Sequence, residues 1–159
     1  MTGLDRARLL AALVPAGLLA GAYGSQYLGG LVPCEMCYWQ RWPHFAALAF
    51  ASLSFGLAGR LPDRGRSLVW LAALAMFVSG GIGVYHAGVE LDIFEGLTQC
   101  STGSGGGTLA EIMSAPLVRC DQVQWSLLGI SMAGWNAIVS IGFGAVILWL
   151  SLRRPRIRT

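Results

Sequence analysis

Four cysteines are the residues of this chain best suited to chemistry, and they come as two pairs. Two residues separate Cys34 from Cys37, while Cys100 and Cys120 flank a polar stretch rich in glycine. The C-x-x-C spacing is typical of a reversible dithiol, because its bridge closes too short a loop to add much stability. Thiolates exchange disulfides only at close range, so two pairs on one surface indicate electron transfer by direct exchange.

The cysteines have two alternative uses, as structural disulfides or as metal ligands. Both pairs could form structural disulfides, and a Cys100–Cys120 bridge would contribute roughly 3 kcal/mol by chain-entropy arguments. Four thiolates could also bind zinc tetrahedrally. Zinc sites usually combine two C-x-x-C motifs, however, and 19 residues separate the members of the second pair. We therefore expect no metal site.

The composition places these cysteines beside a lipid bilayer. Hydrophobic residues make up 55% of the 159 residues and charged residues 12%, which does not suit a soluble domain of this length. About 20 apolar residues cross the hydrocarbon core as a helix, and the chain has four uncharged stretches near or above that length. We predict an all-α membrane protein, a bundle of four transmembrane helices forming one domain over residues 1–159, with helices at about 9–28, 33–57, 67–89 and 126–152.

The arginines predict how the bundle faces. All eleven basic residues are arginines, and nine lie before the first helix, between the second and third, or after the fourth. Positive side chains accumulate in cytoplasmic segments, so we expect both termini in the cytoplasm and all four cysteines on the opposite, outer side of the membrane, where disulfides persist. The net charge of +3 is then a topology signal, and we expect no nucleic-acid binding. A cleaved signal peptide ending near residues 20–22 is the competing interpretation of the first stretch.

The outer loop, residues 90–125, has two predicted parts. Thr102–Thr108 is nearly all glycine, serine and threonine, so it should be flexible and let Cys100 change partners. Apolar residues then recur at near-helical spacing, at Leu109, Ile112, Met113 and Leu117. This pattern indicates a short amphipathic helix on the membrane surface, and a packed loop fits it equally well.

Two ionisable residues join the first cysteine pair as site candidates. Arg41 follows Cys34 and Cys37 at helical spacing, so the three share one face, and Pro33 favours a helix whose N-terminus stabilises a thiolate there. His86 is level with the C-x-x-C motif on the third predicted helix and is a candidate hydrogen-bond or proton donor to a bound acceptor. The alternatives are an arginine that reaches lipid phosphates and a histidine held by structural partners.

Two segments resemble those of a known family. Residues 33–41, PCEMCYWQR, are similar to the first redox motif of the DsbB-type disulfide bond formation proteins, which are bacterial inner-membrane thiol:quinone oxidoreductases. Residues 125–132, WSLLGISM, resemble the segment that enters the last helix of these proteins. Helix number, orientation and cysteine placement extend the resemblance over nearly the whole chain. The loop between Cys100 and Cys120 is shorter and richer in glycine than in familiar members of this family. The chain could therefore resemble the DsbI-like relatives, which serve a dedicated partner, rather than the general DsbB type.

The resemblance implies an enzyme, a protein-disulfide:quinone oxidoreductase of the inner membrane. Cys100 and Cys120 would oxidise a soluble periplasmic thioredoxin-like protein of the DsbA type, with Cys100 in the mixed disulfide. Electrons would pass through Cys120 and Cys34 to the first pair, and then to ubiquinone or menaquinone.

The resemblance also implies where the quinone would bind. It would lie beside Cys37 and Arg41, with His86 near the same site. The rival interpretations are a membrane thiol reductant carrier, an enzyme like vitamin K epoxide reductase, and a non-enzymatic metal-binding or transport protein. The sequence leaves open which quinone and which partner are used.

Overall fold

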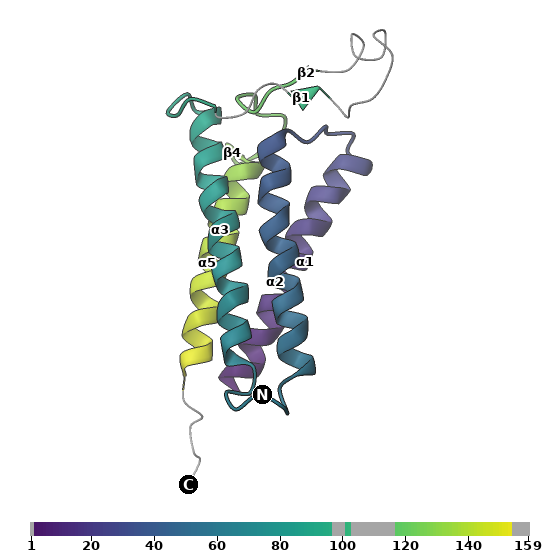
Figure 1. Cartoon of the computed structure of the whole chain (residues 1–159). Helices are drawn as coiled ribbons and strands as arrows, with labels where there is room; N and C mark the ends of the chain where they lie inside the picture. Colours follow the sequence, from purple (N-terminus) through teal and green to yellow (C-terminus); the bar gives the residue numbers. More distant parts are fainter. Residues whose placement is uncertain (1, 97–100, 103–116, 154–159) are drawn as a thin grey trace.

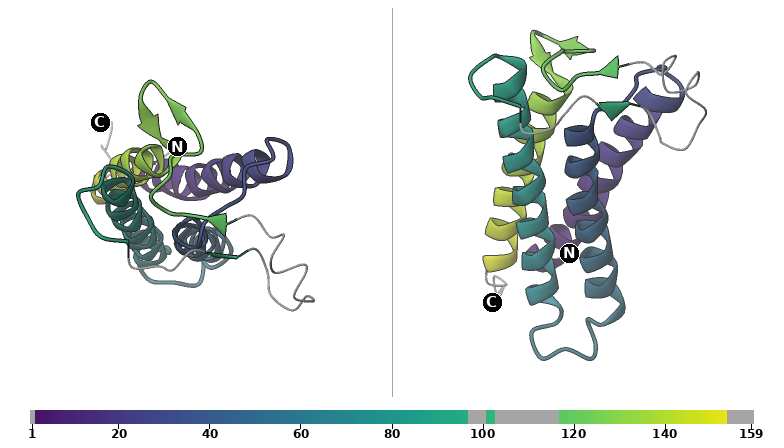
Figure 2. Two further views of the ribbon diagram at one scale, coloured as in Figure 1. Left: turned by 90° about the horizontal axis from the view of Figure 1, so that it is seen from above. Right: turned by 45° about the horizontal axis from the view of Figure 1, so that its top comes forward.

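The computed structural model describes residues 2–96, 101–102 and 117–153, which form a bundle of four helices (Figure 1). The helices are α1 (Gly3–Tyr27), α2 (Glu35–Gly56), α3 (Arg66–Glu90) and α5 (Met132–Leu152). Helix α3 packs between α2 and α5, and α1 packs against those same two helices. The C-terminal half of α1 leans away from α5, as both the side and top views show (Figure 2).

Three of these helices, α1, α3 and α5, are long and apolar enough to cross a membrane. The prediction of a helical membrane protein is confirmed in this form. Helix α2 has 22 residues, and its first half carries polar side chains that lower its hydropathy, among them Glu35, Gln40 and Arg41. That α2 also crosses the bilayer stays a prediction.

The first helix begins six residues before the expected position. Thr2 caps it through a capping box, in which Asp5 N donates to Thr2 Oγ1 at 3.2 Å and Thr2 N donates to Asp5 Oδ2 at 2.8 Å. This reciprocal bonding satisfies N–H groups that have no partner inside the helix. The polar first turn therefore extends the helix beyond the apolar stretch used to predict it.

The last helix begins at Met132 rather than at residue 126. Strands β3 (Ser126–Leu127) and β4 (Ile130–Ser131) form a hairpin in front of it. Both turn residues have positive φ, 54° at Leu128 and 77° at Gly129, which is the turn whose twist suits a two-residue hairpin. Ser131 then caps α5 by accepting a hydrogen bond from Gly134 N at 3.1 Å.

A second strand pair lies within the outer loop. Strand β1 (Ser101–Thr102) runs antiparallel to β2 (Leu117–Val118). The predicted flexible stretch lies outside the described residues apart from Thr102, and so does the predicted amphipathic helix apart from Leu117. The strand pair brings residue 118 to the side of residue 101 at the outer end of the bundle.

Small side chains let the helices approach closely. All four helices contribute to the core, and α1, α2 and α3 each contribute two alanines. Its buried members are Leu4, Ala7, Ala11, Ala47, Ala51, Val69, Ala72, Ala73, Met76 and Ile147. At the α3–α5 contact, a Cβ on Gly83 would lie 2.9 Å from the carbonyl oxygen of Ala133. Small residues at such contacts are the usual means by which membrane helices pack.

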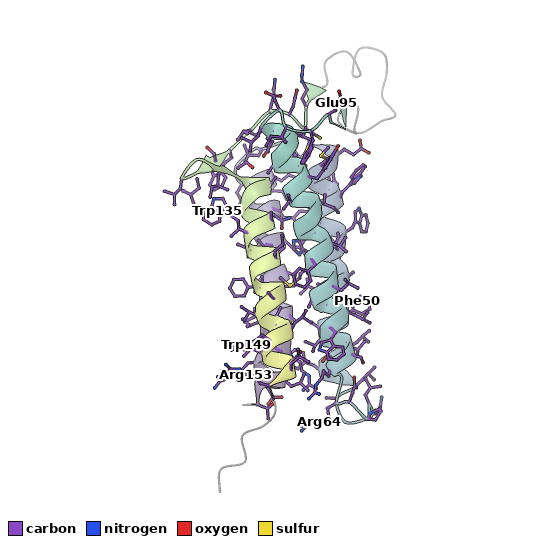
Figure 3. The ribbon with its side chains drawn as sticks, turned by 90° about the vertical axis from the view of Figure 1, so that its left-hand side faces the viewer. Phe50, Arg64, Glu95, Trp135, Trp149 and Arg153 are labelled. Atoms are coloured by element: carbon purple, nitrogen blue, oxygen red, sulfur yellow. The ribbon has the colours of Figure 1, made fainter. Side chains whose placement is uncertain are left out.

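Charged residues lie at both ends of the bundle. Figure 3 shows Arg64 and Arg153 at one end and Glu95 at the other. Arg8 belongs to the arginine-rich end but is buried, with 5% of its surface exposed, and its Nε donates to Ser54 Oγ at 2.9 Å. Arg8 therefore ties α1 to α2 at that end.

The turn before α3 is held by an aspartate. Asp63 accepts hydrogen bonds from Ser67 N at 2.7 Å and Gly65 N at 2.9 Å. These bonds, chiefly those with Ser67, hold the pKa of the Asp63 carboxyl below its usual value. A carboxylate at this position also suits the positive end of the α3 dipole.

We expect Gly83→Ala to destabilise the bundle, because the new methyl group would press against the α5 backbone. Overpacking of this kind costs about 1–3 kcal/mol. Gly81→Ala is the matched control, since no described atom beyond the adjacent backbone of α3 lies within 4 Å of the position that its new methyl carbon would take. Thermal unfolding in detergent measures both variants, and equal midpoints would contradict the close contact.

Candidate functional site

The first cysteine pair lies at the N-terminus of α2. Cys34 is the N-cap residue, and its sulfur accepts a hydrogen bond from Cys37 N at 3.4 Å. The two sulfurs are thiols 3.1 Å apart. The unpaired N–H groups and the dipole of a helix N-terminus favour a negative charge, so this position suits a thiolate. The helix starts at Glu35, two residues after Pro33, and therefore places Cys37 in its first turn.

The third described cysteine packs against the first. Cys120 follows strand β2, is 9% exposed, and forms one buried cluster with Cys34, Met36 and Val89. Cys100 lies outside the described residues, and the next residue, Ser101, pairs with Val118. Residues more than 80 positions apart in the sequence thus bring their sulfurs together at one end of the bundle.

His86 lies beside Cys34. Its ring is buried on α3, with Nε2 3.5 Å from Cys34 Sγ and 3.9 Å from Glu90 Oε1. Glu90 is itself buried, and its other oxygen has no hydrogen-bond partner among the described residues. Glu90 was not among the predicted site residues. Its position four residues after His86 was the available signal, because i and i+4 side chains are neighbours on a helix.

Arg41 is buried against the end of α1. It is 6% exposed, and its guanidinium donates to Gln26 Oε1 at 2.7 Å and to the Ala22 carbonyl at 3.3 Å. The guanidinium carbon also lies 4.6 Å from the centre of the Tyr23 ring. These contacts do not fit an arginine that extends to lipid phosphates. They hold a permanent positive charge inside the protein, one helical turn after Cys37.

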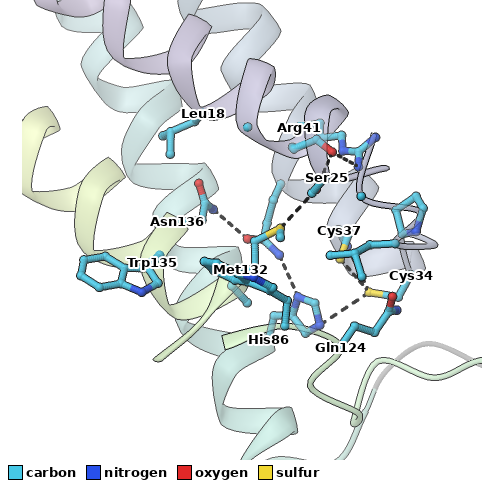
Figure 4. Close-up of a pocket in the computed structure, with 18 of the residues that line it drawn as sticks. Leu18, Ser25, Cys34, Cys37, Arg41, His86, Gln124, Met132, Trp135 and Asn136 are labelled. Carbon is cyan, nitrogen blue, oxygen red and sulfur yellow. Dashed lines mark hydrogen bonds between the residues drawn. The ribbon is translucent and has the colours of Figure 1, made fainter. Parts of the chain in front are cut away.

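A cavity of about 540 Å³ joins these residues (Figure 4). Its volume is within the range of about 300–1,000 Å³ that is usual for small-molecule sites. One wall is apolar and comes from α1 at Gly17, Leu18, Leu19, Gly21 and Ala22. The opposite walls carry groups able to bond or transfer protons, at Cys34, Cys37, Gln40, Arg41, His44, His86, Glu90 and Asn136.

Besides Glu90, three of these polar residues were not predicted as site residues. Gln40, His44 and Asn136 form hydrogen bonds with one another and with His86 below the cysteines. The available signal was a polar side chain inside an apolar stretch, because such groups in membrane helices face the interior and find partners there.

The cluster also meets the distance requirement of a metal site. The sulfurs of Cys34 and Cys37 and a ring nitrogen of His86 all lie within 4.8 Å of one another. Two thiolates and one imidazole are ligands that zinc accepts. Whether His86 can ligate depends on which ring nitrogen carries its proton.

The apolar helices and the buried cysteines at one end of the bundle define a multi-pass helical membrane protein. Comparison with known families makes this more specific. The family model described as Disulfide bond formation protein DsbB matches residues 5–150, and the chain belongs to this family.

Individual relatives agree along the chain. The Disulfide bond formation protein B of Xanthomonas euvesicatoria is 32% identical over 93% of this chain and 90% of its own length. Those of Aromatoleum aromaticum and Hahella chejuensis are 30% and 29% identical, over 90% and 91% of this chain and 89% and 91% of their own lengths. No solved structure matches the chain.

We expect Cys34 and Cys120 to bridge readily when they are the only two cysteines, because their side chains share one buried cluster. The variant carries Cys37→Ser and Cys100→Ser. Under mild oxidation, the loss of its free thiols is measured by the gel shift that a bulky maleimide produces on each remaining thiol. The control retains Cys37 and Cys120 instead and should bridge several times more slowly. Equal rates, or no bridge in the first variant, would contradict the packing.

Proposed function

We propose that this chain oxidises a soluble periplasmic thioredoxin-like protein of the DsbA type and passes the electron pair to a membrane quinone. Membership of the DsbB family supports an oxidoreductase of disulfide bond formation. The observation that carries the proposal is the meeting of Cys34, Cys37 and Cys120 beside a cavity with an apolar wall. Such a site serves both a sulfur relay and a lipid-soluble acceptor.

The relay begins with a loop disulfide between Cys100 and Cys120. A partner thiolate attacks Cys100, the loop bond breaks, and the electron pair goes to Cys120. The partner's second thiolate then attacks the mixed disulfide, which leaves the partner oxidised and Cys100 as a thiolate.

The exchange continues to the first pair, which starts as a disulfide. Cys120 attacks Cys34, the Cys34–Cys37 bond breaks, and Cys37 leaves as a thiolate. Cys100 then attacks Cys120, which restores the loop disulfide and releases Cys34. The contact between Cys120 and Cys34 supports the attack of Cys120 on Cys34. The position of Cys37 in the first turn of α2 favours the negative charge that Cys37 carries when it leaves.

The cavity suits a quinone, which when bound supplies a two-electron acceptor that re-forms the Cys34–Cys37 disulfide. The α1 wall would hold a flat apolar ring. Arg41 provides a fixed positive charge near the sulfur that gives up electrons, and its Nε has no hydrogen-bond partner among the described residues. A buried donor of this kind is costly unless a ligand or water satisfies it.

We further propose that all four helices cross the bacterial inner membrane, with both termini in the cytoplasm. Helix α2 runs beside α3 along its length (Figure 1), so a bilayer crossed by α3 would also contain α2. Arg64 and Arg153 lie at the end opposite the cysteines, in agreement with positive residues on the cytoplasmic side.

Purified protein with a reduced thioredoxin-like substrate should reduce ubiquinone or menaquinone. The change in quinone absorbance measures this reaction. Cys37→Ser should abolish turnover. Arg41→Met should lower kcat/KM for quinone by roughly 10–100-fold, because a hydrogen bond from a charged group is worth about 1.5–3 kcal/mol. Arg60→Met, exposed in the turn between α2 and α3, is the control. No turnover by the wild type, or full turnover by Cys37→Ser, would reject the proposal.

Reporter fusions test the membrane arrangement. Green fluorescent protein joined after residue 159 should fluoresce, and alkaline phosphatase at the same position should be inactive, because that end is expected in the cytoplasm. Alkaline phosphatase inserted between residues 103 and 108 should be active. A reversed pattern, or the loss of an N-terminal tag by cleavage, would overturn the four-span arrangement.

A further inference from the structure

A continuous chain of hydrogen bonds runs from the first cysteine into the bundle. Cys34 Sγ is 3.5 Å from His86 Nε2, and His86 Nδ1 is 2.8 Å from Gln40 Nε2. Gln40 Oε1 is 2.7 Å from Asn136 Nδ2, and Asn136 Oδ1 is 2.8 Å from His44 Nε2. The chain links α2, α3 and α5, and Figure 4 shows its part from Cys34 to Asn136.

Main-chain carbonyls fix the orientation of both amides in this chain. The Gln40 NH2 group donates to the Met36 carbonyl at 3.2 Å, and the Asn136 NH2 group donates to the Ser79 carbonyl at 3.3 Å. A carbonyl oxygen only accepts hydrogen bonds, so the nitrogen of each amide must face it. Turning either amide over would place two acceptors against each other.

The amide orientation determines where each histidine carries its proton. Because the Gln40 NH2 group donates to Nδ1 of His86, Nδ1 holds a lone pair and the proton of the neutral ring is on Nε2. The acceptors near Nε2 are Cys34 Sγ at 3.5 Å, Glu90 Oε1 at 3.9 Å and the Cys120 backbone. Asn136 Oδ1 accepts, so His44 carries its proton on Nε2 as well. Neutral imidazole has one donor nitrogen and one acceptor nitrogen, and its partners decide between them.

We propose that Gln40 and Asn136 are positioning residues that fix the His86 tautomer, so that His86 donates a hydrogen bond to the Cys34 sulfur when it leaves as a thiolate. This rests on the proposed relay. In the step where Cys100 attacks Cys120, the Cys34–Cys120 bond breaks and its electron pair goes to Cys34. The Nε2–H group stabilises that charge without giving up its proton, because hydrogen bonds to charged groups are the strong ones.

The same tautomer opposes the metal interpretation of this cluster. A neutral histidine that binds a metal through Nε2 needs its lone pair there and its proton on Nδ1, usually donated to an acceptor. Here the group at Nδ1 is a donor. Cys34, Cys37 and His86 have the spacing of metal ligands, but the Gln40 amide holds the histidine in the form that does not ligate.

Nitrogen-15 NMR of full-length protein labelled at histidine tests the proposal, because it reports which ring nitrogen carries the proton. The protein has two histidines, so the His44→Asn variant assigns the signals. We expect wild-type His86 to show a protonated Nε2 and an unprotonated Nδ1. Gln40→Glu should protonate Nδ1, since a carboxylate only accepts. Gln124→Leu is the control, because among the described residues the Gln124 amide donates to the Val32 carbonyl and to neither histidine, so both rings should stay unchanged.

A reactivity measurement gives a second readout. With Cys37→Ser, Cys100→Ser and Cys120→Ser, Cys34 is the only thiol, and adding Gln40→Leu should slow its alkylation at fixed pH by roughly three- to tenfold, because less thiolate is stabilised. Adding Gln124→Leu should not slow it.

A wild-type His86 protonated on Nδ1 would overturn the proposal even if the variants fail to fold. So would a Gln40→Leu protein with unchanged ring signals and alkylation rate. Neither measurement uses quinone or the thiol partner. Lack of turnover with the expected tautomer would therefore reject the proposed function alone.

Discussion

The rest of the site depends on one constraint, that a sulfur buried in a protein made of apolar helices needs something to stabilise its charge. The start of α2 provides it, because Cys34 and Cys37 occupy the cap and first turn, where backbone N–H groups have no partner inside the helix. Arg41, one turn further, and His86, across from α2, add a charge and a donor. Every other element of the site holds these groups in place or limits access to them.

Holding them in place requires helices that approach closely and polar side chains that form hydrogen bonds with one another. Lipid offers no hydrogen bonds, so buried polar side chains in a membrane bundle must satisfy one another. The amides of Gln40 and Asn136 do this between α2, α3 and α5, at the level where Gly83 lets α3 and α5 come together. Helix α1 is the exception, since its outer half leans away and leaves the cavity, which Arg41 closes from the side by bonding to Gln26 and Ala22.

Much of this could be predicted from local patterns. The uncharged stretches located the helices. The C-x-x-C motif with Arg41 at helical spacing grouped three residues that line one cavity in the structure. The errors were local as well. The hairpin before α5 was taken as helix because residues 126–131 carry no charge, and the positive φ of Leu128 leaves no mark in composition. Glu90 was not predicted as a site residue, because its burial comes from packing between segments.

The sequence by itself determined the class of protein, its apolar helices, and the dithiol at a helix N-terminus, because hydropathy, proline and residue spacing act over a few turns. Only the tertiary structure decided that Cys120 meets Cys34, that His86 bonds to Cys34, and that two amides orient both histidines. Those contacts join segments 46 to 96 residues apart. Helix crossing and side-chain direction set such distances, and neither follows from the periodicity of one helix.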